Sequence, residues 1–159
     1  GINRNDFMSL VQMRPEGGTA YGTLEWVAYA SNAFNTMVPF YADVDETPEY
    51  LANTTGEVST GNFYWTSRMI AAMADASYGK SLFHVEHYQE NVLAKSHALI
   101  NQYDALLADE KDPEKQMELK RKANRKVAEM VQKEASATLK KVLYELSNQM
   151  KNSYARSDV

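Results

Sequence analysis

The most prominent polar cluster of the sequence is His84-Val85-Glu86-His87, with Glu90 three residues further on. Residues three positions apart share one face of a helix, so these side chains could in principle hold a metal ion. The spacing His-Glu-x-x-His, which is typical of zinc peptidases, does not occur here. We therefore interpret the cluster as the polar start of an exposed helix and expect no metal at His84 or His87.

Nucleophilic side chains paired with a base are not evident. The sequence contains no cysteine, which excludes disulfides, thiolate metal ligands and a cysteine nucleophile from this chain. Ser96 and His97 are adjacent, but neighbouring residues of a helix point in different directions. The residues alone therefore predict neither a catalytic pair nor a bound cofactor.

A basic segment contains Lys120, Arg121, Lys122, Arg125 and Lys126. Glutamates surround it, no aromatic residue interrupts it, and the whole chain carries a net charge of −4. Because nucleic-acid binding usually requires a basic surface, we expect a solvated helix face and no nucleic-acid partner. No apolar run approaches the ~18 residues of a membrane span, and nothing indicates secretion, so we expect a cytoplasmic protein without membrane contact.

The elements that must position these side chains begin with strands. Phe7–Met13 is a short apolar run without alternation, which is typical of a strand covered on both faces, and residues 14–18 favour a turn. Leu24–Ala30 and Phe34–Tyr41 are predicted as two further strands. Pro39 cannot donate to a strand ladder and so indicates an edge or a bulge. The short links predict an antiparallel meander of three strands.

Helical periodicity replaces the strand pattern from residue 62 onward. Between the two lies a polar connection over residues 43–61, with a short helical turn expected near Tyr50. Helices are predicted over Phe63–Ser77 with Gly79 closing the first, over Phe83–Ala108, and from Pro113 to about Ser153. The fold class is therefore α+β, with a β-rich part at 1–42, a connection at 43–61 and a helical part at 62–159.

The third predicted helix has the clearest signals. Asp112 is a good N-cap and Pro113 suits the first helical position, while Glu118 is placed to pair with Lys122. Its second half carries an apolar stripe through Val127, Val131, Thr138, Val142, Leu146 and Met150. At ~1.5 Å per residue the helix would be about 60 Å long, so we expect it to pack along something absent from this chain or to kink.

Several short motifs resemble, in order, the last third of PepD-type bacterial dipeptidases. They are Asn3-Arg4 through Val11-Gln12-Met13-Arg14-Pro15, Leu24-Glu25-Trp26-Val27-Ala28, Met37-Val38-Pro39-Phe40-Tyr41, Tyr64-Trp65, Ala72-Met73-Ala74-Asp75-Ala76, Ala94-Lys95-Ser96-His97, Ile100-Asn101-Gln102-Tyr103-Asp104, and Met150-Lys151-Asn152-Ser153-Tyr154-Ala155-Arg156-Ser157-Asp158. Each motif is short, but together they cover nearly the whole chain. The chain is thus similar to the C-terminal portion of such an enzyme.

The resemblance implies a cysteine peptidase of the N-terminal-nucleophile class, with a four-layer αββα sandwich and dipeptides as substrates, without a metal. In this class the thiol of the mature first residue attacks the amide and its own α-amino group acts as base. The chain has no cysteine and opens with Gly1, so we expect the nucleophile to lie upstream. The chain alone is then expected to be an inactive scaffold and pocket wall.

Few catalytic residues carry over from the resemblance. Asn3-Arg4 is similar to a motif in which an arginine sets the environment of the nucleophile, and a guanidinium beside a thiol would lower its pKa. Arg4 is therefore the catalytic candidate, with a polar residue at a strand start as the alternative. Asn32 lies at a strand turn and could face a pocket, but we assign it no role as an oxyanion donor.

The partners expected are the missing N-terminal portion of the same protein and, in the full-length enzyme, a dipeptide. Strands at Leu24–Ala30 and Phe34–Tyr41 should have lost neighbours, and their exposed surface should cause self-association. A different class of function remains open, namely a self-standing helical module without catalysis, whose long helix binds another protein.

Overall fold

The computed structural model describes residues 6–52 and 54–151. The strands are β1 (Phe7–Met13), β2 (Thr23–Tyr29) and β3 (Val38–Tyr41), and the long helices are α2 (Phe63–Ala76), α3 (Tyr78–Asp109) and α4 (Pro113–Ser147). Short helical segments η1 (Pro15–Gly17), α1 (Gly18–Tyr21) and η2 (Glu49–Leu51) lie in the connections. The predicted α+β class, with strands first and three main helices after them, is confirmed.

The three strands form one antiparallel sheet in the order β1-β2-β3, so the predicted meander is also confirmed. Leu10 lies opposite Trp26, and Trp26 lies opposite Pro39 on the outer strand. The third strand is shorter than predicted and starts only at Val38. The first residues of the predicted strand form a turn instead, because the Ser31 carbonyl accepts hydrogen bonds from the N–H groups of Phe34 and Asn35, at 2.9 and 3.0 Å.

The outer edge of β3 is closed by a side chain from α4. The Oδ1 atom of Asn124 accepts a hydrogen bond from the Tyr41 N–H at 2.8 Å, and its Nδ2 donates to the Tyr41 carbonyl at 3.0 Å. Asn124 is buried, and its amide satisfies the N–H and carbonyl groups of Tyr41 that a neighbouring strand would otherwise bind. This pair of bonds fixes α4 against the sheet.

The predicted covering of Phe7–Met13 on both faces is wrong for this chain. Phe7, Leu10, Val11 and Met13 are each more than half exposed, because only β2 pairs with β1 and no described element covers its outward side chains. The strands at β2 and β3, expected to have lost their neighbours, are instead largely buried. The open strand of the described structure is therefore β1.

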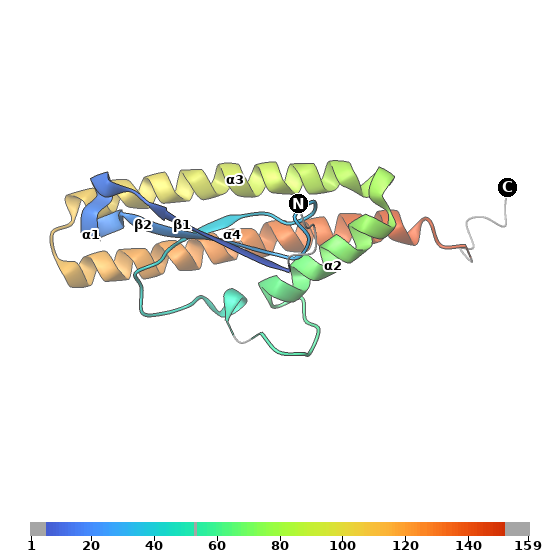
Figure 1. Cartoon of the computed structure of the whole chain (residues 1–159), viewed down its shortest axis with the longest axis horizontal. Coiled ribbons are helices and arrows are strands. Elements are labelled where there is room, and N and C mark those ends of the chain that lie inside the picture. The colour runs from blue at the N-terminus through green and yellow to red at the C-terminus, as the bar shows by residue number, and fades with distance from the viewer. Residues whose placement is uncertain (1–5, 53, 152–159) are drawn as a thin grey trace.

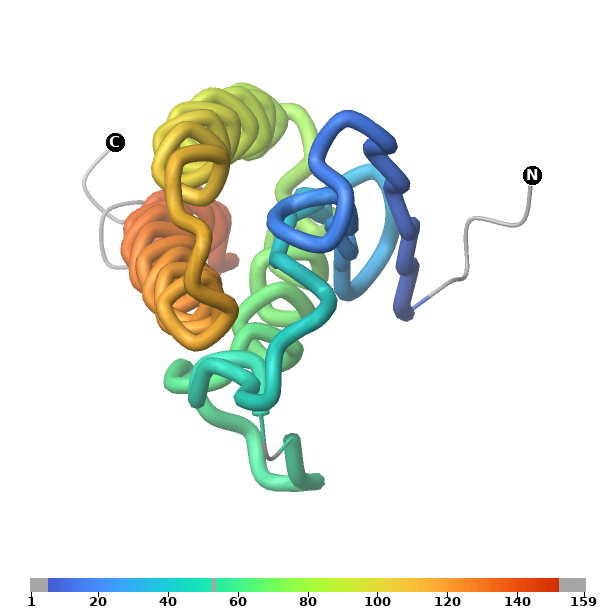
Figure 2. The backbone as a smooth tube through the Cα atoms, turned by 90° about the vertical axis from the view of Figure 1, so that its left-hand side faces the viewer, coloured from blue at the N-terminus to red at the C-terminus, as the bar shows by residue number. Residues whose placement is uncertain are grey.

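The helices α3 and α4 lie side by side as a long antiparallel hairpin (Figure 1). Viewed along the long axis, this hairpin occupies one side of the molecule and the strands the other (Figure 2). The face of the sheet that carries Leu24 packs on Ile100, Tyr103 and Leu107 of α3. The opposite face, with Val27, belongs to a larger core that also takes in α2 and both hairpin helices.

Several helix boundaries differ from prediction. Helix α3 starts at Tyr78, five residues before the predicted Phe83. The first helix is not closed by Gly79, since a single residue, Ser77, links α2 to α3 and its hydroxyl donates to the Met73 carbonyl at 2.8 Å. The third helix ends at Ser147. Its apolar stripe is buried as far as Val142, whereas Met150 is 57% exposed, and a helix end without packing has little to stabilise it.

The length of α4 has a simpler explanation than the two that the sequence suggested. Helix α4 packs along α3, α2 and β3 of this chain, so it needs no absent partner for its stripe. Its N-terminus forms as predicted, with the Asp112 side chain accepting from the Glu114 N–H at 3.0 Å and Pro113 in the first turn. The short helical turn expected near Tyr50 is present as η2.

Candidate functional site

Arg4, the catalytic candidate, lies outside the described residues, and the site is built here from Asp6 onward. Asp6 precedes β1 and is joined to the end of β2, since its carbonyl accepts a hydrogen bond from the Ala30 N–H at 2.9 Å. The start of β1 and the end of β2 therefore lie together. A hollow of about 310 Å³ opens at this end of the sheet.

The rim of the hollow includes a residue in an unusual backbone conformation. Ala30 has φ of 70°, in the left-handed region that residues with a Cβ seldom adopt. The buried side chain of Asn35 donates to the Ala30 carbonyl at 3.0 Å, so the conformation is held from both sides of the residue. Such positions cost of order 1 kcal/mol or more and occur often at functional sites.

Helix α2 supplies the wall of the hollow through Arg68, Ala71, Ala72 and Asp75. These positions are three, four and seven residues apart, which places them on one face of the helix. The two charged residues stand at the ends of this stripe and the two alanines between them. The Cα atoms of the cation and the anion thus lie about 10 Å apart along the helix axis, with small side chains between them.

The guanidinium of Arg68 is held by several groups. Its Nη1 donates to Asp6 Oδ2 at 3.1 Å and to the Tyr64 hydroxyl at 2.7 Å. It also lies over the rings of Tyr64 and Trp65, 5.4 and 5.6 Å from their centroids. The bond to Tyr64 and then the charge of Asp6 raise the pKa of Arg68, so it is a cation at every physiological pH.

A second, larger hollow of about 660 Å³ lies between the sheet and α3. Asn32 lines it, as expected for a residue at this turn, together with Trp26 and His97, whose rings are 5.8 Å apart. Gln89 closes one side by donating to the Asn35 carbonyl at 2.7 Å. Its lining is mainly apolar, and among the residues described here it holds no nucleophile paired with a base.

The histidine cluster on α3 is divided between two environments. The Nε2 atom of His84 lies 3.3 Å from Glu145 Oε1 on α4, whereas His87 packs on Phe83 with 4.4 Å between ring centroids. Within residues 6–52 and 54–151, no three His, Asp or Glu side chains converge on a point where a metal could bind. Ser96 is fully buried and makes no hydrogen bond to its neighbour His97.

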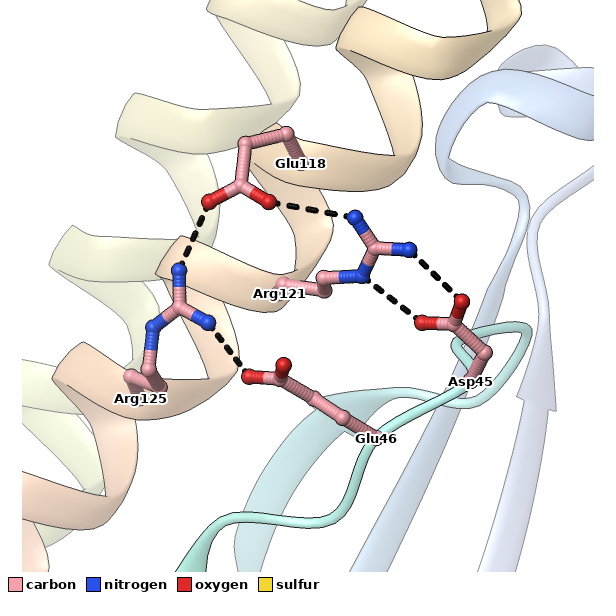
Figure 3. A network of polar contacts seen from close by, with 5 residues as sticks. All are labelled: Asp45, Glu46, Glu118, Arg121 and Arg125. Atoms are coloured by element: carbon pink, nitrogen blue, oxygen red, sulfur yellow. Dashed lines mark hydrogen bonds and ion pairs between the residues drawn. The ribbon is translucent and has the colours of Figure 1, made fainter.

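The basic segment of α4 fastens the connection after β3 to the helix (Figure 3). Arg121 binds Asp45 through two hydrogen bonds of 2.7 and 2.6 Å, and Arg125 binds Glu46 at 2.5 Å. Glu118 bridges the two arginines at 3.1 and 2.7 Å, so its predicted pairing with Lys122 is wrong. The two arginines reach this carboxylate from positions three and seven residues further along the helix, whereas Lys122 forms no ion pair with any residue that the structure describes.

The ion pairs of α4 also affect whether this segment could bind a nucleic acid. Lys120 is buried and binds Asp43 at 2.6 Å, so the segment is not simply a solvated helix face as predicted. Hydrogen bonds from Arg121 lower the pKa of Asp45, and those from Arg121 and Arg125 lower the pKa of Glu118. Because these cations already have carboxylate partners, the segment offers little free charge to a phosphate backbone.

Arg68 and Asp75 are the site residues that sequence reasoning missed. The stripe Arg-x-x-Ala-Ala-x-x-Asp was visible in the sequence, but its meaning depended on Asp6 and Ala30 reaching the same place. None of the helices in the described part of the chain is long and apolar enough to cross a membrane.

Comparison with known proteins gives consistent matches. The model of peptidase family C69 matches residues 1–91. A protein named "Probable dipeptidase A" from Streptococcus pyogenes serotype M18 (strain MGAS8232) is 41% identical over 160 residues, which cover 99% of this chain and 32% of the relative. A "Dipeptidase" from Bifidobacterium longum is 34% identical over 196 residues, covering 99% of this chain and 37% of the relative.

A third relative matches a shorter stretch. A "Probable dipeptidase B" from Lactococcus lactis subsp. lactis is 32% identical over 104 residues, 65% of this chain and 22% of the relative. The chain spans about a third of the length of the first two curated relatives.

Proposed function

The chain belongs to peptidase family C69, and from this membership we propose that it is the scaffold and one pocket wall of a cysteine dipeptidase. The observation that carries the proposal is the match of 99% of the chain, at 41% identity, to a relative named as a dipeptidase. The chain covers only 32% of that relative and contains no cysteine. The nucleophile then belongs to a part of the polypeptide outside this sequence.

The proposed chemistry follows the N-terminal-nucleophile pattern. The cysteine sulfur attacks the carbonyl carbon of the dipeptide, its proton passes through the free α-amino group to the leaving amine, and water then hydrolyses the thioester. Arg4 would favour the thiolate by lowering the pKa of the thiol. In this proposal the sheet β1-β2-β3 and the α3–α4 hairpin supply two of the four layers of an αββα sandwich.

The exposed strand β1 supports the scaffold role. Leu10 points from one face of the sheet while Phe7, Val11 and Met13 point from the other, and the edge of the strand is open. Exposed apolar strand edges tend to pair with another strand. We assign this surface to the remaining portion of the same polypeptide, and with that portion absent we expect self-association through β1.

The alternative function, a helical module that binds a partner through its long helix, has less support. Val127, Val131 and Val142 on the stripe of α4 are fully buried inside this chain. That stripe is therefore not available to another protein. The cytoplasmic location stays a prediction.

The test compares the full-length protein with this chain alone and with this chain mixed with the remaining portion. We expect dipeptide hydrolysis by the full-length protein, none by the chain, and partial recovery on mixing. Replacing the nucleophilic cysteine by serine should abolish hydrolysis by the full-length protein. Hydrolysis by the purified chain alone would contradict the proposal.

A matched pair of variants tests whether the exposed strand β1 is the surface that binds the remaining portion. Val11→Lys places a charge on β1, whereas Leu143→Lys places one at an exposed position of α4. We expect only Val11→Lys to lower the recovery on mixing and the self-association of the chain, measured by light scattering. Equal effects of the two variants, or a strictly monomeric unmodified chain, would refute the assignment of β1.

A further inference from the structure

The hollow at the end of β2 contains a positive and a negative side chain, and these are opposite in sign to the carboxylate and ammonium ends of a short peptide. Arg68 and Asp75 lie on one face of α2, with their Cα atoms about 10 Å apart along its axis. The Arg68 guanidinium is directed back to Tyr64, one turn nearer the start of the helix, so the charged groups are farther apart than the Cα atoms. A dipeptide with free ends is a zwitterion whose ammonium and carboxylate groups lie about 7 Å apart when extended. Adding a charge-assisted hydrogen bond of ~2.8 Å at each end gives about 13 Å between the protein groups that would hold it.

We propose that this hollow binds the two charged ends of a dipeptide substrate, Arg68 taking the α-carboxylate and Asp75 the α-ammonium group. The inference rests on the proposed dipeptidase function. It adds to that function the residues that select substrates by the length of the peptide. A single amino acid is too short to reach both groups, and each additional residue adds ~3.5 Å that the stripe does not provide.

The guanidinium of Arg68 is prepared for a carboxylate. Within the described residues its hydrogen bonds all come from Nη1, to Asp6 and Tyr64, and the two aromatic rings below it fix its plane. Its Nη2 and Nε atoms can then form the paired bonds that guanidinium groups make with carboxylates. The ion pair with Asp6 is exposed, at 40% and 64% of the side chains, so a substrate carboxylate competes with it at small cost.

The floor between the two charges suits a peptide backbone. Ala71 and Ala72 present only methyl groups, which lets the substrate lie close to the helix. Phe34, at the edge of the hollow, offers apolar contact for a substrate side chain. The volume of about 310 Å³ lies at the small end of the range for ligand pockets, which suits a dipeptide.

The experiment uses the full-length enzyme and three substrates: Ala-Ala, its N-acetyl form and its C-terminal amide. We expect the unmodified enzyme to favour Ala-Ala over either blocked form by about tenfold or more in kcat/KM, because a site built for a group rejects an analogue that lacks it. In the Arg68→Gln variant, kcat/KM should fall about tenfold for Ala-Ala and for the acetyl form, which both carry the carboxylate. For the amide, which lacks the carboxylate, kcat/KM should stay within about twofold. Asp75→Asn should lose a similar factor on Ala-Ala and on the amide, and little on the acetyl form.

Arg125→Gln and Asp45→Asn make the same substitutions in the ion-pair network away from the hollow, and should leave all three rates within about twofold. The inference is overturned if kcat/KM of the Arg68 and Asp75 variants falls by the same factor for all three substrates, or does not fall at all. If one of these variants fails to fold, the other decides alone. Hydrolysis of Ala-Ala without charge selectivity overturns only this inference, whereas no hydrolysis of Ala-Ala by the unmodified full-length protein overturns the proposed function as well.

Discussion

The ion pair between Arg14 and Asp104 should be the most sensitive polar contact of the fold. Arg14 follows β1, and its Nη1 and Nη2 atoms donate to the Asp104 carboxylate on α3 at 2.6 and 3.1 Å. The Tyr41 hydroxyl donates to the same carboxylate at 2.7 Å. The side chains of the pair are only 13% and 19% exposed, so three elements meet at a carboxylate that water hardly reaches.

Asp104→Asn keeps the size of the side chain but leaves the guanidinium of Arg14 without its counter-charge. Removing one partner of a buried ion pair costs about 3–5 kcal/mol. Partial exposure and the remaining amide oxygen reduce that cost, so we expect the free energy of unfolding to fall by about 2–4 kcal/mol. The measurement is urea denaturation followed by circular dichroism, with the slope m compared between variants.

A control variant and a double-mutant cycle test whether the loss of stability comes from the Arg14–Asp104 pair. Asp109→Asn, at an exposed position of the same helix, should change stability by less than about 0.5 kcal/mol. The double variant Arg14→Met with Asp104→Asn, compared with each of these substitutions alone, should lose less stability than the sum of the two, with a coupling of about 1–3 kcal/mol. A loss below about 0.5 kcal/mol for Asp104→Asn, or strict additivity in the double variant, would refute the reasoning.

Two other consequences concern α4. Asn124→Leu leaves the Tyr41 N–H and carbonyl unsatisfied in the interior, so it should cost about 2–4 kcal/mol of stability by urea denaturation, while Gln132→Leu at an exposed position of the helix should cost almost nothing. The lowered pKa values of Asp45 and Glu118 mean that the folded chain binds fewer protons at these carboxyls than the unfolded chain does, so their contribution is present at neutral pH and is lost as the pH falls through their folded-state pKa values. The urea midpoint should therefore decrease below about pH 4.5, and Arg121→Gln should flatten this decrease; an unchanged pH profile in that variant would contradict the assignment.

Local signals explain which parts of the fold the sequence could predict. The run Phe7–Met13 and the cap at Asp112 were placed correctly because a turn and an N-cap are decided by a few neighbouring residues. The end of α4 was not, because it depends on where its packing partners stop. Exposure of β1 was missed for a related reason: an apolar run shows that a strand can be covered, but not whether its cover belongs to the same chain.

The site was harder to predict than the fold because it joins distant segments. Lys120 looked like part of a solvated surface until the connection after β3 placed Asp43 beside it. Arg68 looked like one polar residue among the apolar residues of α2, and its place in a hollow becomes visible only when Asp6 and the turn after β2 lie next to it. Spacing along one helix is visible in a sequence, whereas the groups that a second segment brings to that helix are not.

The position of Asp6 connects the two proposals made for this chain. It lies directly before the exposed strand β1 and also contributes to the hollow that contains Arg68. A portion of polypeptide that pairs with the open edge of β1 would therefore pass beside the hollow. Under the two proposals together, a nucleophile carried by that portion would lie beside the dipeptide proposed to bind between Arg68 and Asp75. This chain would then bind the two charged ends of the substrate, and the docked portion would attack the peptide bond between them.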